Sequence, residues 1–122
     1  MEERKLSPTI LIDLAKDRIR IHRVTLSALQ NPEYILLIVN PAEKSLGIMR
    51  SSSEAPGAHK VKCVGKLCYE LYSKSLVQKF REVCPNWLET GKYRMTGNIV
   101  PGAMIAQFSM SAAEFKGTGK VS

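Results

Sequence analysis

The sequence predicts a small single domain of the α+β class, built mostly from antiparallel strands with few helices. The chain has 122 residues, the length of one ordinary domain, and a chain of this size can bury a sizeable core. Hydrophobic residues make up 44% of it, which argues against disorder. Several short segments alternate apolar and polar residues with a period of two, whereas one longer segment has the period of an amphipathic helix. We therefore expect residues 1–122 to form one domain.

The chain is expected to begin with an arm and two strands. Residues 1–9 are polar and contain a proline, so we expect a loose N-terminal arm. A short apolar stretch predicts a strand over 10–14, and a second strand is predicted over 18–23, where isoleucines alternate with basic residues. One face of the second strand carries Arg18, Arg20 and His22.

A short helix and a hairpin are expected next. Thr25 can cap a helix over about 25–30, and the Asn31–Pro32 step ends it because a residue before proline disfavours helical geometry. The apolar run 34–39 predicts a strand buried on both faces. A turn rich in asparagine and proline then leads to a return strand over 45–49.

The small and polar residues 51–58 form the clearest loop, between two halves of the chain. The second half predicts, in order, strands over 60–64 and 67–72, a helix over about 75–84, and a hairpin of 92–95 with 104–110. Ser73 or Ser75 caps this helix and Pro85 ends it.

The end of the chain is rich in turn-forming residues. The last hairpin is expected to turn at Gly97–Asn98 or at Pro101–Gly102. Residues 116–122 lack the spacing of a phosphate-binding loop and are expected to be a flexible tail.

The two halves share an order of elements: strand, capped helix ended before a proline, then hairpin. Thr25 corresponds to Ser75, and Asn31–Pro32 corresponds to Cys84–Pro85. This order fits either an internal repeat or coincidence in a small α+β protein, and the poor residue identity between the halves favours coincidence.

Positive charge is the strongest compositional signal. The formal net charge is +7, which favours polyanionic partners. Residues 16–23 hold four basic residues and one acidic, and residues 60–81 hold six basic residues and one acidic. The positive charge is therefore concentrated in two clusters.

These clusters suggest a non-enzymatic nucleic-acid-binding protein, such as a small bacterial or phage regulator. Alternate residues of a strand are about 6.5–7 Å apart, close to the spacing of phosphates along one strand of nucleic acid. The candidate contacts are Arg18, Arg20, His22, Arg23, Lys60, Lys62, Lys66, Lys74, Lys79 and Arg81. The other interpretation is a solvated strand face whose charges protect an edge.

Aromatic residues leave two interpretations open. Exposed aromatics beside basic residues stack on bases in single-strand binders, but sparse aromatics are more often packing residues. The aromatics concerned are Tyr34, Tyr69, Tyr72, Trp87 and Tyr93.

Other classes of function have little support. The carboxylates are scattered, and neither the serines nor the thiols have an identifiable base partner, so no catalytic site is expected. The three cysteines and two histidines lack the spacing of a zinc site or of a disulfide framework. No metal or cofactor is expected. No apolar run reaches 18 residues, so neither a membrane span nor a membrane partner is expected, and a cytoplasmic location is the default.

The stretch Arg20–Leu29, followed by strand, turn and strand to Met49, resembles the AbrB/MraZ-type swapped-hairpin DNA-binding regulators. In those families a basic strand leads into a short helix and a hairpin follows, so the resemblance implies DNA binding. It covers about a quarter of the chain and lacks the usual Ile-Pro at the helix start and Gly-Asp before the next strand. The chain is also similar in general character to small proteins of bacterial mobile elements and phages.

Two kinds of partner are therefore expected. The first is nucleic acid, with DNA as the leading candidate. The alternative is an acidic protein, bound by a protein-binding module such as a phage- or mobile-element-encoded inhibitor. A homodimer is compatible with either.

Overall fold

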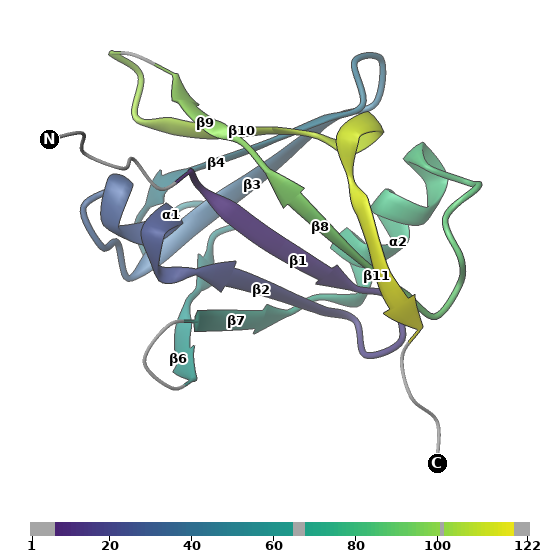
Figure 1. Ribbon diagram of the computed structural model, residues 1–122. Coiled ribbons are helices and arrows are strands. Elements are labelled where there is room, and N and C mark those ends of the chain that lie inside the picture. Colours follow the sequence, from purple (N-terminus) through teal and green to yellow (C-terminus); the bar gives the residue numbers. More distant parts are fainter. Residues whose placement is uncertain (1–6, 65–67, 101, 119–122) are drawn as a thin grey trace, which may run out of the picture.

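A computed structural model of the protein describes residues 7–64, 68–100 and 102–118 (Figure 1). The strands form two antiparallel sheets, and two helices accompany them, as the sequence predicts for an α+β domain. Sheet A contains, in spatial order, β11 (Glu114–Thr118), β8 (Gly91–Thr96), β1 (Thr9–Asp13), β2 (Arg18–His22), β7 (Cys68–Tyr72) and β6 (Lys62–Val64). Sheet B contains β5 (His59–Lys60), β3 (Tyr34–Asn40), β4 (Ser45–Ser51), β10 (Ile105–Ser109) and β9 (Asn98–Val100).

Two segments cross from one sheet to the other and close them into a barrel. Residues 59–64 pair with β3 through β5 and with β7 through β6, on either side of the buried Val61. Residues 91–100 pair with β1 through β8 and with β10 through β9, on either side of Gly97. A Cβ atom at Gly97 would overlap the carbonyl oxygen of Gln107, so the crossing requires glycine there.

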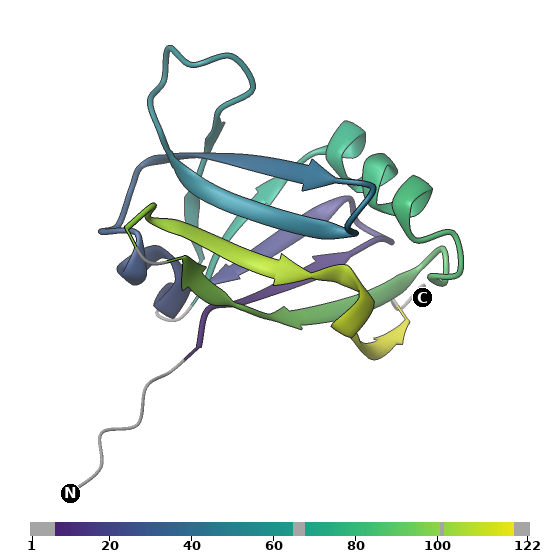
Figure 2. The same ribbon diagram turned by 90° about the horizontal axis from the view of Figure 1, so that it is seen from above.

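The barrel interior is filled by the inward faces of both sheets, and the helices cover its two ends. Large fully buried side chains from both sheets include Ile12, Ile19, Ile48 and Phe108. The helices α1 (Arg23–Ala28) and α2 (Lys74–Val83) lie at opposite ends in both views (Figures 1 and 2). They add further buried side chains, namely Leu26 from α1 and Leu76, Val77, Phe80 and Val83 from α2.

The start of α1 differs from the expectation. Thr25 lies inside the helix and is buried, and its hydroxyl donates to the carbonyl oxygen of Thr9 at 3.0 Å. The cap is instead His22, whose Nδ1 accepts from the amide of Val24 at 3.1 Å. The cap of α2 is the expected Ser73, whose hydroxyl accepts from the amide of Leu76 at 3.2 Å.

Three further differences concern the strands. β3 is not buried on both faces, since Ile38 is 52% exposed. The strand over 92–95 is not the hairpin partner of the strand over 104–110, because the chain crosses between the sheets at Gly97 and β8 pairs with β1 and β11. The partner of β10 is β9, and the turn between them lies near Gly102, with its φ of 79°, at the second of the two expected positions. Residues 116–118, expected in a flexible tail, belong to β11, which pairs with β8.

The pairing registers reveal an approximate twofold relation between the halves. The hairpin partners Val39 and Leu46 have counterparts in Ile99 and Ala106, each 60 positions further along the chain. Arg20 of β2 pairs with Glu70 of β7, 50 positions further along, so the axis passes between them. Equivalent strands also share their order, with a helix after β2 and after β7. These registers favour an internal repeat over coincidence, although the low residue identity between the two halves favoured coincidence.

Candidate functional site

The outward face of sheet A gathers most of the candidate residues from the first cluster. Ile19 and Ile21 are fully buried, so the predicted alternation places Arg18, Arg20 and His22 on the outer face. The registers extend this face into two rows across the sheet. The first row is Tyr72, Arg18, Asp13 and Lys92, and the second is Lys62, Glu70, Arg20, Leu11, Arg94 and Glu114.

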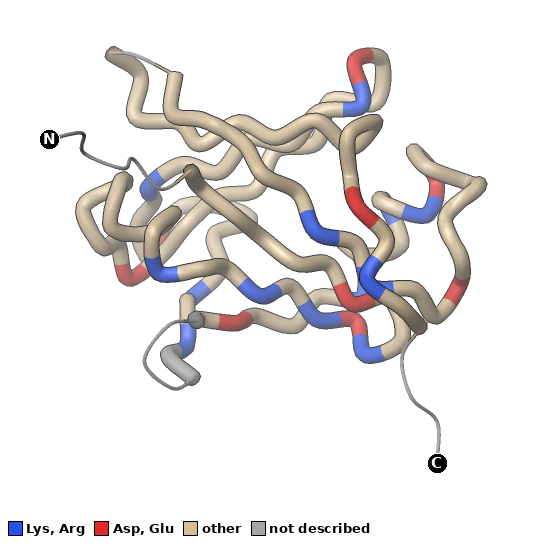
Figure 3. Tube along the Cα trace, in the orientation of Figure 1, with Lys and Arg blue, Asp and Glu red and all other residues tan. Residues whose placement is uncertain are grey.

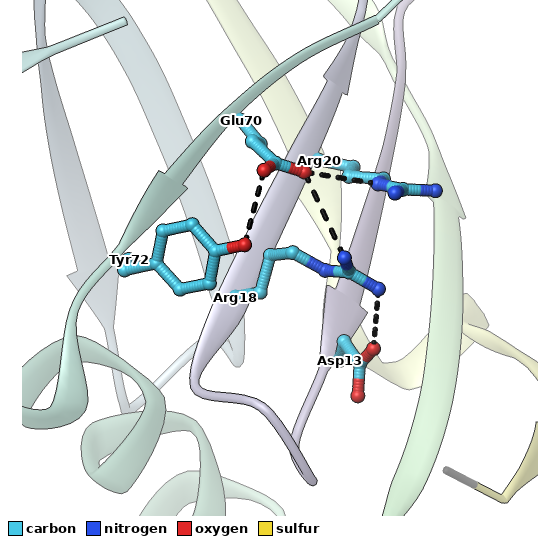
Figure 4. A network of polar contacts seen from close by, with 5 residues as sticks. All are labelled: Asp13, Arg18, Arg20, Glu70 and Tyr72. Carbon is cyan, nitrogen blue, oxygen red and sulfur yellow. Dashed lines mark hydrogen bonds and ion pairs between the residues drawn. The ribbon is translucent and has the colours of Figure 1, made fainter. Parts of the chain in front are cut away.

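Arg18 belongs to a nearly buried network of ion pairs (Figure 4). Its guanidinium lies 2.9 Å from the carboxylate of Asp13 and 3.8 Å from that of Glu70, and its side chain is 12% exposed. Burial by itself lowers the pKa of Arg18, but the hydrogen bond to Asp13 and both neighbouring carboxylates raise it above its ordinary value. Arg18 therefore stabilises the sheet, and little of it is accessible to a ligand.

Glu70 holds Arg20 in a fixed position. Its carboxylate accepts from Nε of Arg20 at 3.2 Å and from the hydroxyl of Tyr72 at 3.0 Å. Burial alone raises the pKa of Glu70, but these hydrogen bonds and the charges of Arg18 and Arg20 lower it overall. Arg20 is 41% exposed, and Figure 4 shows the terminal nitrogens of its guanidinium pointing away from Glu70, across β1.

A similar pair lies on the other side of β1. Arg94 of β8 donates from Nε and Nη2 to one carboxylate oxygen of Glu114 in β11, at 3.3 and 3.0 Å. Both side chains are exposed. Arg20 and Arg94 are each register partners of Leu11, so they flank this leucine. Each arginine is tethered by a glutamate on the strand beyond it.

A hollow of about 470 Å³ lies between the two arginines. Thr9, Ile10 and Leu11 of β1 contribute to its lining, together with Arg20, His22, Lys92, Arg94 and Lys116. All these lining residues are in the described part of the chain, and none of them is acidic. The basic residues come from three strands that are distant in sequence, and the positions of Lys and Arg along these strands can be followed in Figure 3.

His22 lines the hollow and also caps α1. Since its Nδ1 accepts a backbone hydrogen bond, Nε2 is left as the donor nitrogen of the neutral ring. The neighbouring Arg23 is exposed at the start of α1.

The second sequence cluster does not form one surface. Lys62 lies on the outer face of sheet A opposite Glu70, whereas Lys60 pairs with Tyr34 in sheet B. Lys74 and Lys79 are exposed on α2, at one end of the barrel. Lys66 lies outside the described residues.

Arg81, the last member of that cluster, has a structural role. Its guanidinium donates to the carbonyl oxygens of Leu14 at 2.7 Å and Glu89 at 3.2 Å, and lies 3.9 Å from the carboxylate of Asp17. It therefore ties α2 to the turn between β1 and β2 and to the segment after the helix.

Sequence reasoning missed Lys92, Arg94 and Lys116. The first two alternate around the buried Tyr93, and this period of two was the available signal. Their position beside β1 depends on strand pairing over about 80 residues of chain, which no local pattern encodes.

Most of the candidate aromatics are packing residues. The rings of Trp87 and Tyr93 are stacked with centroids 4.3 Å apart, and Phe115 packs on Tyr93 at 5.5 Å. Tyr69 is partly buried against the core. Tyr72 is different, since it is 59% exposed and lies in the first row of the basic face.

The described residues form neither a cluster of metal-ligating side chains nor a membrane-spanning helix. No group of three or more His, Cys, Asp or Glu side chains there could hold a metal ion. The α-helices in the described part of the chain are α1 and α2, and neither is long and apolar enough to cross a membrane. The thiol of Cys84 is buried, and burial raises its pKa although Lys44 acts in the opposite direction.

Comparison with known proteins identifies no relative: no family model, no curated protein and no solved structure matches the chain.

Proposed function

We propose that this protein binds nucleic acid without enzymatic activity, using the outer face of sheet A. The observation that carries the proposal is the convergence of Arg20, Lys92, Arg94 and Lys116 on one hollow, although they come from three separate strands. Phosphates are bound by such groups through charge and counterion release. The order of β2, α1, β3 and β4 is also the order of elements in the AbrB/MraZ-type regulators, which supports a role as a small regulator.

The outer face of sheet B, on the opposite side of the barrel, carries little charge, which supports sheet A as the binding face. The outward positions of β3, β4, β10 and β9 in sheet B carry only uncharged residues, such as Ile38, Met49, Gln107 and Val100. In the described chain, the outer face of sheet B carries one charged strand residue, Lys60 of β5 beside Tyr34, so most strand cations lie on the outer face of sheet A. A polyanion approaching the molecule is attracted to sheet A rather than to sheet B.

The experiment is fluorescence anisotropy with labelled single-stranded and duplex DNA oligonucleotides of random sequence. If four phosphates are contacted, the affinity for either form of DNA is expected to fall roughly 50- to 150-fold between about 50 and 200 mM salt. The variant Arg20→Glu/Arg94→Glu is expected to abolish binding. Both replaced side chains are at least two-fifths exposed, and Arg18 and Tyr72 remain as partners of Glu70, so circular dichroism is expected to show a folded protein of lower stability.

A matched control separates a specific surface from general charge. The variant Lys74→Glu/Lys79→Glu makes the same change in net charge on the exposed surface of α2. It is expected to retain most of the affinity. Equal loss in both variants would contradict the assignment of the surface, and absence of binding at low salt would favour an acidic protein as the partner instead.

A further inference from the structure

We infer that the hollow on sheet A takes an unpaired nucleotide, so that the preferred ligand is a single strand rather than a duplex. This inference rests on the proposed function and names its substrate class. Three features carry it: the apolar floor of the hollow, the way its arginines are held, and one exposed aromatic ring.

The floor of the hollow is unsuited to a phosphate. Leu11 lies between Arg20 and Arg94 in the register of the sheet, and neighbouring strands are about 4.8 Å apart, so the two arginine backbones are separated by about 10 Å. An apolar side chain offers no donor to a phosphate oxygen. It does offer contact to the face of a base, which is free only when the base is unstacked.

The two arginines are held from outside the hollow. Glu70 engages Nε of Arg20, and Glu114 engages Nε and Nη2 of Arg94. Both glutamates lie on strands beyond the arginines, so the remaining guanidinium nitrogens stay available to the hollow that both arginines line. Figure 4 shows the terminal nitrogens of Arg20 pointing away from Glu70. A fixed guanidinium plane can stack on a base or donate to the adjoining phosphate.

Tyr72 supplies an aromatic surface on the same face of sheet A, on the other side of Glu70 from Arg20 (Figure 4). Tyr72 is 59% exposed, and its hydroxyl donates to the same Glu70 carboxylate that holds Arg20. The ring is therefore exposed and anchored at once. Base stacking on such rings next to basic residues is the usual mode of single-strand binding. A duplex, whose bases are already stacked, contacts neither Tyr72 nor Leu11 through its phosphates.

The test compares three DNA ligands about 12 nucleotides long, within the usual range of single-strand sites. They are a single strand, its blunt duplex, and an abasic strand that keeps the phosphates but has no bases. The single strand is expected to bind roughly 10-fold tighter than either of the others, on the scale of one stacked base.

Substitution of Tyr72 gives an independent test. Tyr72→Ala is expected to weaken single-strand binding roughly 5- to 100-fold and to leave duplex binding within about twofold. Tyr72→Phe keeps the ring, so it is expected to retain most of the affinity. Tyr34→Ala, which removes a tyrosine on the outward face of sheet B, is the matched control and is expected to bind like the wild type.

The outcomes separate this inference from the proposed function. If the abasic strand or the duplex binds as tightly as the single strand, and Arg20→Glu/Arg94→Glu abolishes all binding, the inference is overturned while the proposed function stands. If none of the three ligands binds at low salt, both fail.

Discussion

Glu70 connects structure and candidate function at the scale of single residues. It accepts hydrogen bonds from Arg20 and Tyr72 and lies 3.8 Å from Arg18, while its own side chain is only 10% exposed. A carboxylate with so little water around it is stable because several donors surround it. The same contacts orient Arg20 and anchor the ring of Tyr72.

Replacing this carboxylate is expected to destabilise the fold. Glu70→Gln removes the charge that partners two arginines and is expected to lower the free energy of unfolding at pH 7 by about 2–4 kcal/mol. Urea denaturation measures this change. Glu114→Gln is the control, because that ion pair is exposed and its loss is expected to cost less than about 1 kcal/mol.

The pH dependence of this effect has a definite sign. The pKa of Glu70 is lower in the folded protein than in the unfolded chain, so its stabilisation is complete above the unfolded pKa. It is lost as the pH falls through the folded value. The stability difference between wild type and Glu70→Gln is therefore expected to shrink in acid, and a difference that stays constant down to about pH 3 would contradict the ion-pair assignment.

At the scale of elements, the two crossing segments decide the shape of the molecule. Without the crossings at Val61 and Gly97, sheets A and B would be separate and would have four open edges. Gly97 also donates its amide hydrogen to the carbonyl oxygen of Pro8 at 2.9 Å, which fixes the approach to β1. The crossing therefore holds β8 in the position that brings Arg94 beside Leu11.

Gly97→Ala is expected to be among the more damaging single substitutions. Its Cβ would meet the carbonyl oxygen of Gln107 and lie 2.7 Å from the ring of Phe108, so the crossing must shift. We expect a loss of roughly 1–3 kcal/mol or more in thermal or urea unfolding. Gly47→Ala, where the nearest atom is 3.4 Å away on the Ile105 side chain, is expected to cost clearly less. Equal losses in the two variants would argue against the crossing.

At the scale of the whole molecule, each half depends on the other. β2 pairs with β7, β4 pairs with β10, β1 pairs with β8, and β3 pairs with β5. Each of these pairs joins one strand of the first half to one of the second. We therefore expect the two halves to fold and unfold together as one barrel rather than as two small domains.

Fragments test this interdependence. The fragment 1–58 is expected to show no cooperative thermal transition by circular dichroism, because half of its strand pairing is missing. Mixing it with fragment 59–122 is expected to restore a cooperative transition. A fragment 1–58 that unfolds cooperatively as a monomer would contradict the single barrel.

The sequence by itself determined the features that depend on neighbours along the chain. The alternation in Arg18–His22 identified a strand and its outward face, since side chains of a strand alternate. Ser73 and the apolar stripe of α2 located the longer helix, because caps and helical faces arise within a few residues. The shared order of elements also hinted at the twofold relation.

Only the tertiary structure decided which basic side chains are paired inside the fold and which line the hollow. Arg18 and Arg81 looked equivalent to Arg20, but strand pairing and helix docking place them against Asp13, Glu70 and the backbone. Lys92, Arg94 and Lys116 enter the hollow because β8 and β11 lie beside β1. Such contacts join residues tens of positions apart, and their formation depends on the packing of the entire barrel rather than on local preference.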